Sequence, residues 1–381
     1  MPIVKSISAI PESLTGFSED ELEGLLRVMG EPGYRARQVR QWIYHGLAES
    51  FNEMSDLPLA LRERLAKEAR LHSLTNMREV TGKDSTVKTA FRLAGGNVVE
   101  ASLMSYRRDS GAPRYTACIS TQVGCAIGCP FCATGQQGFE RNLTTGEIVD
   151  QVLHFARCLR KVTGENERSP TGRSLSNIVF MGMGEPLANY DAVWKAIEIL
   201  NSPGGFGLGA RNLTISTAGL VPQIKRLAGE KLQVGLAVSL HASENRLRNR
   251  LVPINRKYPL EELIPACREY SRVSGRRPSF EYVLFRGIND SLAQARSLAE
   301  LLRGMTCHVN LIPANATGDA SFRPPPRESI VAFALELKRL GINATVRQAR
   351  GQDIDAGCGQ LRRRIPAGEK TRHRQDKMMG E

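Results

Sequence analysis

Three closely spaced cysteines limit what this chain can fold into and bind more than any other feature of its sequence. They lie in Cys125-Ala-Ile-Gly-Cys129-Pro-Phe-Cys132. A structural zinc site closes its tetrahedron with four protein ligands, and a cubane iron–sulfur cluster usually takes four cysteines. Three thiolates on a cubane cluster leave one iron open to a small molecule. A zinc site that borrows a remote fourth ligand and a set of buried core cysteines are the alternatives.

This CxxxCxxC spacing resembles that of the radical S-adenosylmethionine (SAM) enzymes. In those enzymes the open iron chelates the amino and carboxylate groups of SAM, and one electron cleaves SAM to a 5′-deoxyadenosyl radical. The resemblance implies a 4Fe-4S cluster on Cys125, Cys129 and Cys132, with SAM as the second cofactor.

Length and charge narrow the class of protein further. The chain has 381 residues, 41% of them hydrophobic, and a net charge of +13. It is long enough for a packed core, and it has neither an apolar run of bilayer length nor a signal peptide. We therefore expect a cytoplasmic protein without membrane contact. The excess positive charge favours a nucleic-acid partner, and the basic tail after Leu361 is suited to phosphates. A generally basic soluble enzyme is the alternative.

The pattern of apolar residues changes near residue 90. Before it, helical spacing predicts a small accessory domain over 1–90, with Ser18 as an N-cap. Period-two patterns over 86–93 and 97–104 flank Gly95-Gly96 and predict a β-hairpin. We expect the main domain over 91–345, and a last segment over 346–381.

After the hairpin, six strand-like runs alternate with longer helical or loop segments. The runs are 116–121, 177–183, 212–217, 234–240, 280–285 and 308–312. Such alternation predicts an α/β fold with a parallel sheet and outer helices. Eight units would close a TIM barrel, so six predict a partial (β/α)6 barrel with its ligand at the carboxyl ends of the strands.

Small polar residues follow several of these strands. The second strand ends in Gly184 and Glu185, where glycine permits close approach and the carboxylate can hold a ligand ammonium group. The other strand ends supply Ser216, Ser239, Leu240, His241 and Asn315. Together these residues form one rim beside the three cysteines, which is the requirement for binding an adenosylated amino acid.

The other five cysteines lie in different contexts. Cys158, Cys267 and Cys307 lie in helix or strand patterns and are expected to be small core hydrophobes. Cys118 lies on the first strand, where packing is the ordinary explanation. Cys358 lies between glycines in a predicted loop, and loops often carry chemistry, so it is a candidate reactive thiol.

Several longer motifs resemble the RlmN/Cfr family of radical SAM RNA (adenine) methyltransferases, and the resemblance covers nearly the whole chain except the basic tail. In the main domain they are Cys118-Ile-Ser-Thr-Gln-Val-Gly-Cys125, Gly135-Gln-Gln-Gly-Phe139, Met181-Gly-Met-Gly-Glu-Pro186, Ser239-Leu-His-Ala242 and Asp353-Ile-Asp-Ala-Gly-Cys-Gly-Gln-Leu361. The accessory region is similar to the family's N-terminal helical domain at Gly30–Val39, Trp42–His45 and Phe51–Asp56.

The resemblance implies a chemistry and a role for each candidate residue. Cys358 would take a methyl group from one SAM, and a second SAM would yield the radical that abstracts hydrogen from the S-methyl group. The resulting carbon radical would add to C2 of adenine, Glu100 would accept a proton, and Cys118 would release the product by forming a disulfide with Cys358. Gly184, Glu185, Ser216, Ser239, Leu240, His241 and Asn315 would line the SAM site.

The same resemblance implies the partners. The RlmN branch modifies C2 of one adenosine in the peptidyl-transferase loop of 23S rRNA and of the adenosine beside the tRNA anticodon, and the Cfr branch modifies C8 of the same rRNA adenosine. We favour C2, as the housekeeping activity, and keep C8 as the alternative. We expect a monomer that depends on an electron donor. A different radical enzyme and a zinc-dependent RNA-binding module are the competing classes.

Overall fold

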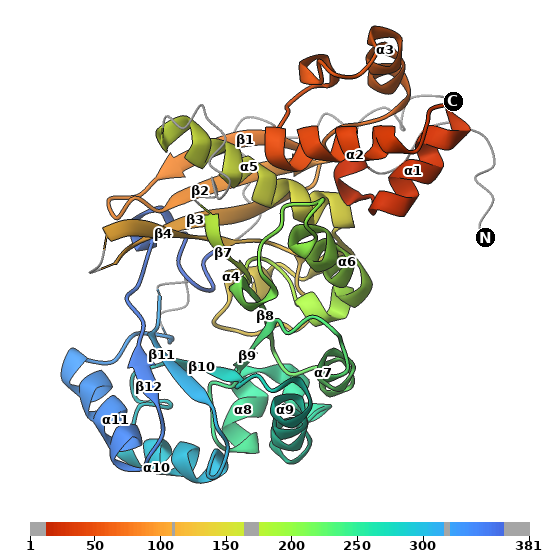
Figure 1. Cartoon of the computed structure of the whole chain (residues 1–381). Coiled ribbons are helices and arrows are strands. Elements are labelled where there is room, and N and C mark those ends of the chain that lie inside the picture. Colours follow the sequence, from red (N-terminus) through yellow and green to blue (C-terminus); the bar gives the residue numbers. More distant parts are fainter. Residues whose placement is uncertain (1–12, 109–110, 164–174, 316–320, 362–381) are drawn as a thin grey trace, which may run out of the picture.

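One mixed sheet of ten strands runs through the computed structural model, which describes residues 13–108, 111–163, 175–315 and 321–361 (Figure 1). In spatial order the strands are β1 (Leu74–Thr81), β2 (Val87–Leu93), β3 (Val98–Arg108), β4 (Gly111–Cys118), β7 (Leu175–Phe180), β8 (Leu213–Thr217), β9 (Gly235–Ser239), β10 (Ser279–Leu284), β11 (His308–Pro313) and β12 (Ala344–Val346).

The sheet has an antiparallel half and a parallel half. Strands β1 to β4 pair antiparallel as a meander, whereas every pairing from β4 through β12 is parallel. Strands β1 and β12 lie at opposite edges, so the curved sheet does not close. This arrangement confirms the predicted α/β fold, a partial barrel preceded by a β-hairpin. All six predicted strands are present, and β12 is a short parallel strand that the sequence did not reveal.

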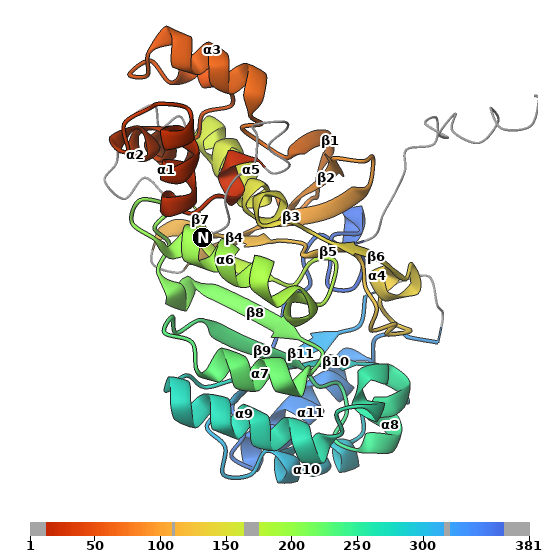
Figure 2. The same cartoon turned by 90° about the vertical axis from the view of Figure 1, so that its right-hand side faces the viewer.

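Helices follow one another along the outside of the parallel half (Figure 2). They are α5 (Thr145–Thr163), α6 (Tyr190–Asn201), α7 (Val221–Ala228), α9 (Leu260–Ser274), α10 (Leu292–Leu301) and α11 (Arg327–Arg339), with the short α4 (Ala133–Gln136) and α8 (Asn245–Leu251) beside the strand ends. A capping box begins α5: the Glu147 N–H donates to Thr144 Oγ1 at 3.2 Å, and the Thr144 N–H donates to Glu147 Oε2 at 3.0 Å. None of the helices in these described ranges is long and apolar enough to cross a bilayer.

The N-terminal helices α1 (Glu19–Val28), α2 (Tyr34–Arg40) and α3 (Leu59–Glu68) lie at the β1 end of the sheet (Figure 1). Ser18 caps α1 as predicted, in a full capping box with Glu21. Leu22, Leu26 and Val39 are fully buried and belong to the same apolar cluster as the barrel core. Burial of this apolar face against the barrel is what stabilises such short helices.

Strand β1 corrects the expectation that the chain is helical up to residue 90. Its apolar residues Leu74, Met77 and Val80 recur every three positions, which is a helical spacing. The pairing register with β2 shifts between Asn76 and Arg78, so a bulge breaks the alternation that normally identifies a strand. The basic tail predicted after Leu361 lies outside the described residues.

Candidate active site

A cavity lies at the carboxyl ends of the parallel strands and encloses about 1580 Å³ including open solvent. Nearly all of the candidate residues line it: Cys118, Cys125, Cys129, Cys132, Gly184, Glu185, Ser216, Ser239, His241, Asn315 and Cys358. The cavity thus brings the three clustered cysteines, the residues that end the strands, and the thiols of Cys118 and Cys358 to one place.

The loop that carries the three clustered cysteines has a rigid backbone. It leaves the ribbon of β5 (Gln122–Gly124) and returns through β6 (Phe139–Asn142). The Cys125 N–H donates to the Gly138 carbonyl at 2.8 Å, and the Cys132 N–H donates to the Cys129 carbonyl at 3.1 Å. At Gly135 a Cβ would lie 2.9 Å from the Cys129 nitrogen, so only glycine fits there.

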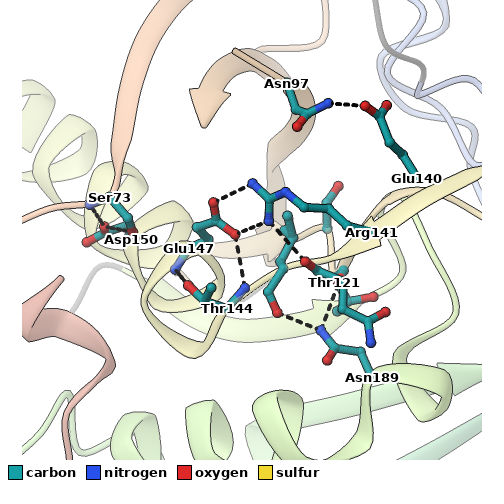
Figure 3. Close-up of polar contacts among 12 residues, drawn as sticks. Ser73, Asn97, Thr121, Glu140, Arg141, Thr144, Glu147, Asp150 and Asn189 are labelled. Atoms are coloured by element: carbon teal, nitrogen blue, oxygen red, sulfur yellow. Dashed lines mark hydrogen bonds and ion pairs between the residues drawn. The ribbon is translucent and has the colours of Figure 1, made fainter. Parts of the chain in front are cut away.

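Asn189 fastens both ends of this loop at its base (Figure 3). Its side-chain amide donates to the carbonyl of Thr121 at 2.9 Å, before the loop, and to the carbonyl of Leu143 at 2.8 Å, after it. Next to this base, Arg141 of β6 forms a two-pronged ion pair with Glu147 in the first turn of α5, with both contacts at 2.7 Å. The loop is thus tied to the barrel before any ligand binds.

The three cysteines fit a cluster that offers one open iron to the cavity. Burial raises the pKa of the Cys125 thiol to about 12 and that of Cys129 well above its ordinary value, and each neighbouring thiol adds to the effect. Three thiolates crowded in a site this dry need a strongly cationic partner. An iron–sulfur cluster is such a partner, and these soft ligands suit it.

Glu185 presents a carboxylate beside the cysteines. Its Oε1 accepts from the Leu187 N–H at 3.0 Å and its Oε2 from the Ala218 N–H at 2.7 Å. Burial raises its pKa to about 7 despite these bonds, so a bound ammonium group would favour the ionised form. The preceding Gly184 has φ of +106°, and a Cβ there would lie 2.6 Å from Gln122 Cβ, which makes glycine necessary.

His241 is a neutral acceptor on the same rim. Its Nδ1 accepts a hydrogen bond from the Val283 N–H at 3.1 Å, and its ring meets Phe131 edge-on at 5.1 Å. Burial lowers its pKa to about 3, and the charge of Arg248 acts in the same direction. The imidazole therefore stays uncharged at physiological pH. It forms part of the cavity wall, and the hydrogen bond that Nδ1 accepts fixes its orientation.

Arg248 of α8 holds the ends of two strands together, and sequence reasoning missed it. It is fully buried and donates to the carbonyls of Ala218 at 2.7 Å, Ser239 at 3.0 Å and Leu240 at 3.1 Å, and to Asn255 Oδ1 at 2.8 Å. No carboxylate pairs with it among the described residues. Burial lowers its pKa to about 10. Only its place in the sequence, soon after the fourth predicted strand, could have indicated it.

The C-terminal segment brings Cys358 to the far side of the cluster loop. Asn315 Nδ2 donates to the Cys358 carbonyl at 3.0 Å, and the Ala133 N–H donates to the Gly359 carbonyl at 2.8 Å. Cys358 is exposed toward the cavity, whereas Cys118 is buried on β4. The two thiols lie close enough that the charge of one raises the pKa of the other.

Arg347 is a second residue that sequence reasoning missed, because it follows the unpredicted strand β12. It lines the cavity and lies 3.4 Å from Glu281 Oε2 in a partly buried ion pair. Burial raises the pKa of Cys118 to about 12 and also raises that of Cys358, whereas the Arg347 guanidinium lowers both. Arg347 is thus the cation that offsets the cost of a thiolate at either sulfur.

Two candidate residues do not line this cavity. Leu240 is fully buried and takes part through its backbone, since its carbonyl accepts from Arg248 at 3.1 Å. Glu100 lies on β3 and forms a buried ion pair with Lys88 at 3.4 Å. It stands two residues before Ser102, which does line the cavity, so both side chains point to one face of the strand.

Comparison with known proteins places this site in a class and then in a family. Residues 168–299 match the radical SAM superfamily, which the open barrel and the three-cysteine loop also define. Residues 13–71 match the ribosomal RNA large subunit methyltransferase N-terminal domain.

Whole-length relatives are more specific. A probable dual-specificity RNA methyltransferase RlmN of Moorella thermoacetica is 49% identical over 92% of this chain and 96% of the relative. The corresponding protein of Heliobacterium modesticaldum is 45% identical over 92% and 90%. A crystal structure of a radical SAM methyltransferase from Sphaerobacter thermophilus is 51% identical, with a TM-score of 0.87 over 92% of this chain and 99% of that one. The chain therefore belongs to the RlmN family of radical SAM methyltransferases, whose superfamily uses a 4Fe-4S cluster and SAM.

Proposed function

We propose that this protein methylates C2 of adenosine in RNA, both in the peptidyl-transferase loop of 23S rRNA and beside the anticodon of tRNA. The observation that carries the proposal is the convergence of Cys118 and Cys358 on the cavity that the cluster cysteines line. C2 of adenine is an electron-poor carbon and does not attack a sulfonium methyl group, so a radical route through a cysteine is required. The names of the relatives support RNA as the substrate.

Cys125, Cys129 and Cys132 would hold the cluster, which when bound supplies the electron that cleaves SAM. Glu185 would bind the ammonium group of SAM, and Ser216, Ser239, Leu240, His241 and Asn315 would form the rest of its site. The closed backbone contacts of the cluster loop and the neutral His241 ring would keep water away from the reacting atoms.

Cys358 would act first as a nucleophile. Its thiol loses a proton, and the thiolate takes the methyl group of one SAM with release of the thioether product. Arg347 favours that thiolate, because its positive charge lowers the pKa of Cys358. The S-methyl group then stands in the cavity beside the cluster loop and gives a hydrogen atom to the radical from a second SAM. Two SAM molecules are therefore consumed in each turnover.

Release of the product would depend on Glu100 and Cys118. After the Cys358-bound methylene has joined C2, Glu100 would accept the C2 proton, and the cluster, when bound, would supply the acceptor for the one electron that the adduct loses. The Cys118 thiolate then attacks the sulfur of Cys358, so that a disulfide forms and the carbon–sulfur bond breaks with its electron pair on the new methyl group, which takes up a proton. The Lys88–Glu100 pair lies next to the catalytic segment, since Lys88 Nζ also approaches the Asp355 carbonyl at 3.4 Å.

The remaining parts of the chain would serve RNA recognition. A net charge of +13 favours a phosphate backbone, and the target base must leave its stack to reach the cavity. We assign RNA binding to the N-terminal region 1–90, radical chemistry to 91–345 and the catalytic cysteine loop with the basic tail to 346–381. The protein would act as a cytoplasmic monomer with a separate electron donor.

Mass spectrometry of nucleosides from cells that lack the gene tests the proposal. We expect 2-methyladenosine to disappear from 23S rRNA and from tRNA, and a plasmid copy to restore it. Unchanged 2-methyladenosine would refute the substrate, and loss of 8-methyladenosine in its place would establish the Cfr-type reaction. Loss from rRNA alone would remove tRNA from the proposal.

Variants test the roles of the two cysteines. Cys358→Ala should abolish methylation, and Cys118→Ala should accumulate a covalent protein–RNA adduct that migrates slowly in denaturing gels. Cys307→Ala is the matched control, since Cys307 is buried outside the cavity, and it should methylate normally. Full methylation by Cys358→Ala would contradict the cysteine-bound intermediate.

A further inference from the structure

A second group of metal-binding side chains lies outside the cavity, where α5 packs against β1 and β2 (Figure 1). Glu79 of β1 meets His154 and Cys158 of α5, which are four residues apart and so lie on one face of the helix. Cys158 was expected to be a core hydrophobe, like the buried Cys267 and Cys307. It is only half-buried and contacts polar groups, which corrects that expectation.

The three donor atoms converge on one point. His154 Nε2 lies 3.2 Å from Glu79 Oε2 and 3.4 Å from Cys158 Sγ, and that sulfur lies 3.7 Å from the same Glu79 oxygen. In a tetrahedral zinc site with bonds of about 2.0–2.3 Å, ligand atoms stand about 3.3–3.6 Å apart. The three distances thus lie within about 0.2 Å of three edges of a zinc tetrahedron.

This convergence differs from a catalytic triad. A triad needs both ring nitrogens of histidine, one toward the nucleophile and the other toward the carboxylate. Here the same nitrogen, Nε2 of His154, faces both Cys158 and Glu79. One nitrogen cannot relay a proton between two partners, but three lone pairs aimed at one point can bind a cation.

We infer that Glu79, His154 and Cys158 form a zinc site that fastens β1 to the helix following the cluster loop. Nitrogen, sulfur and oxygen donors in tetrahedral array select zinc among the common divalent ions. Thr89 Oγ1 lies 3.4 Å from both His154 Nε2 and Glu79 Oε2. Glu79 is partly exposed, which gives the ion a path from solvent.

A neighbouring aromatic side chain orients one of these ligands. Phe91 meets the His154 ring edge-on at 5.0 Å and fixes its orientation. Cysteine binds zinc as the thiolate, so zinc binding should release one proton from Cys158.

Metal analysis can test the site once the cluster thiols are removed. In a full-length background with Cys125, Cys129 and Cys132 changed to serine, dialysis against zinc should leave a single ion bound per chain. Co²⁺ in its place should show thiolate-to-metal charge-transfer absorption. A background protein that is folded by circular dichroism but binds no zinc would overturn the inference.

Further substitutions in that background assign the ligands. Cys158→Ser should abolish the cobalt charge-transfer band, and His154→Ala should lose the bound zinc, whereas Cys307→Ser should keep both signals. Zinc binding that Cys158→Ser leaves unchanged would place the metal elsewhere and refute the site.

A measurement on the holoenzyme needs no substitution. Added zinc should slow alkylation of Cys158, followed by peptide mass spectrometry, by about tenfold or more, because the metal-bound thiolate is not free to react. An unchanged rate would refute the inference even if every variant misfolded. None of these readouts depends on RNA methylation.

Discussion

Replacing Arg248 tests whether the rim of the cavity depends on one buried cation. In Arg248→Met, the acceptors on Ala218, Ser239 and Asn255 lose their donor, whereas the Leu240 carbonyl keeps a bond from the Ala242 N–H at 2.8 Å. An unpaired buried acceptor costs about 1–3 kcal/mol, so three at about 2 kcal/mol each cost about 6 kcal/mol.

Part of this loss is offset by removing a buried charge. The pKa of Arg248 is about 10, against an ordinary value of 12.5. This difference means that burial destabilises the ionised guanidinium by about 3 kcal/mol. The free energy of unfolding should therefore fall by about 3 kcal/mol in Arg248→Met. Urea unfolding of the cluster-free protein, followed by circular dichroism, measures this difference.

The matched control is Arg246→Met, an exposed arginine on the same short helix. It should change the free energy of unfolding by no more than about 0.5 kcal/mol. Equal losses in Arg248→Met and Arg246→Met, or a loss below about 1 kcal/mol in the first, would refute the argument that these carbonyls need the guanidinium.

Two further predictions concern the cluster loop and pH. Gly135→Ala should lower the iron content after anaerobic reconstitution, because its Cβ would meet the Cys129 backbone at 2.9–3.0 Å; Gly24→Ala, with nothing within 4 Å, should bind iron normally. His241 has a pKa of about 3 in the folded protein, below that of an unfolded histidine, so its contribution to stability is lost as pH falls below about 6.5. Between pH 7 and pH 5 this loss is about 2 kcal/mol. His241→Asn, which tolerates the left-handed backbone at φ 60°, should show a pH dependence smaller by that amount in urea unfolding, and an unchanged dependence would contradict it.

The parallel half of the fold could be predicted because its local signals agree with its tertiary structure. Each strand from β7 to β11 is a short apolar run between turn residues, and the helices between them have apolar residues at helical spacing. The N-cap predicted at Ser18 marked the start of α1 for the same reason. Strand β1 was missed because a bulge gives it a helical spacing, and β12 because three residues carry too little pattern.

The residues of the site also divide into those that the sequence predicts and those that it does not. The clustered cysteines and the residues that end strands could be predicted, since spacing and topology alone place them. Arg248 and Arg347 could not, because their importance comes from their surroundings: Arg248 donates to backbone carbonyls, and Arg347 pairs with a carboxylate and lowers the pKa of two thiols. A sequence of 52 lysines and arginines gives no sign that these two have such surroundings.

The turn between β1 and β2 also positions Cys358, the proposed nucleophile, which explains why the antiparallel strands belong to this site. The turn after β1 holds the segment that leads to Cys358: the Lys83 N–H donates to Asp353 Oδ2 at 2.8 Å, and the Gly351 N–H donates to Asp84 Oδ2 at 2.9 Å. Cys358 follows the last strand of an open sheet, and an open sheet leaves the chain beyond that strand without a neighbour on one side. By returning to the β1–β2 turn, the segment gains backbone-to-carboxylate hydrogen bonds in place of the strand neighbour that a closed barrel would supply. In the proposed reaction the open barrel would admit a large substrate, and the β1–β2 turn would hold the segment of Cys358, which the opening would otherwise leave unsupported.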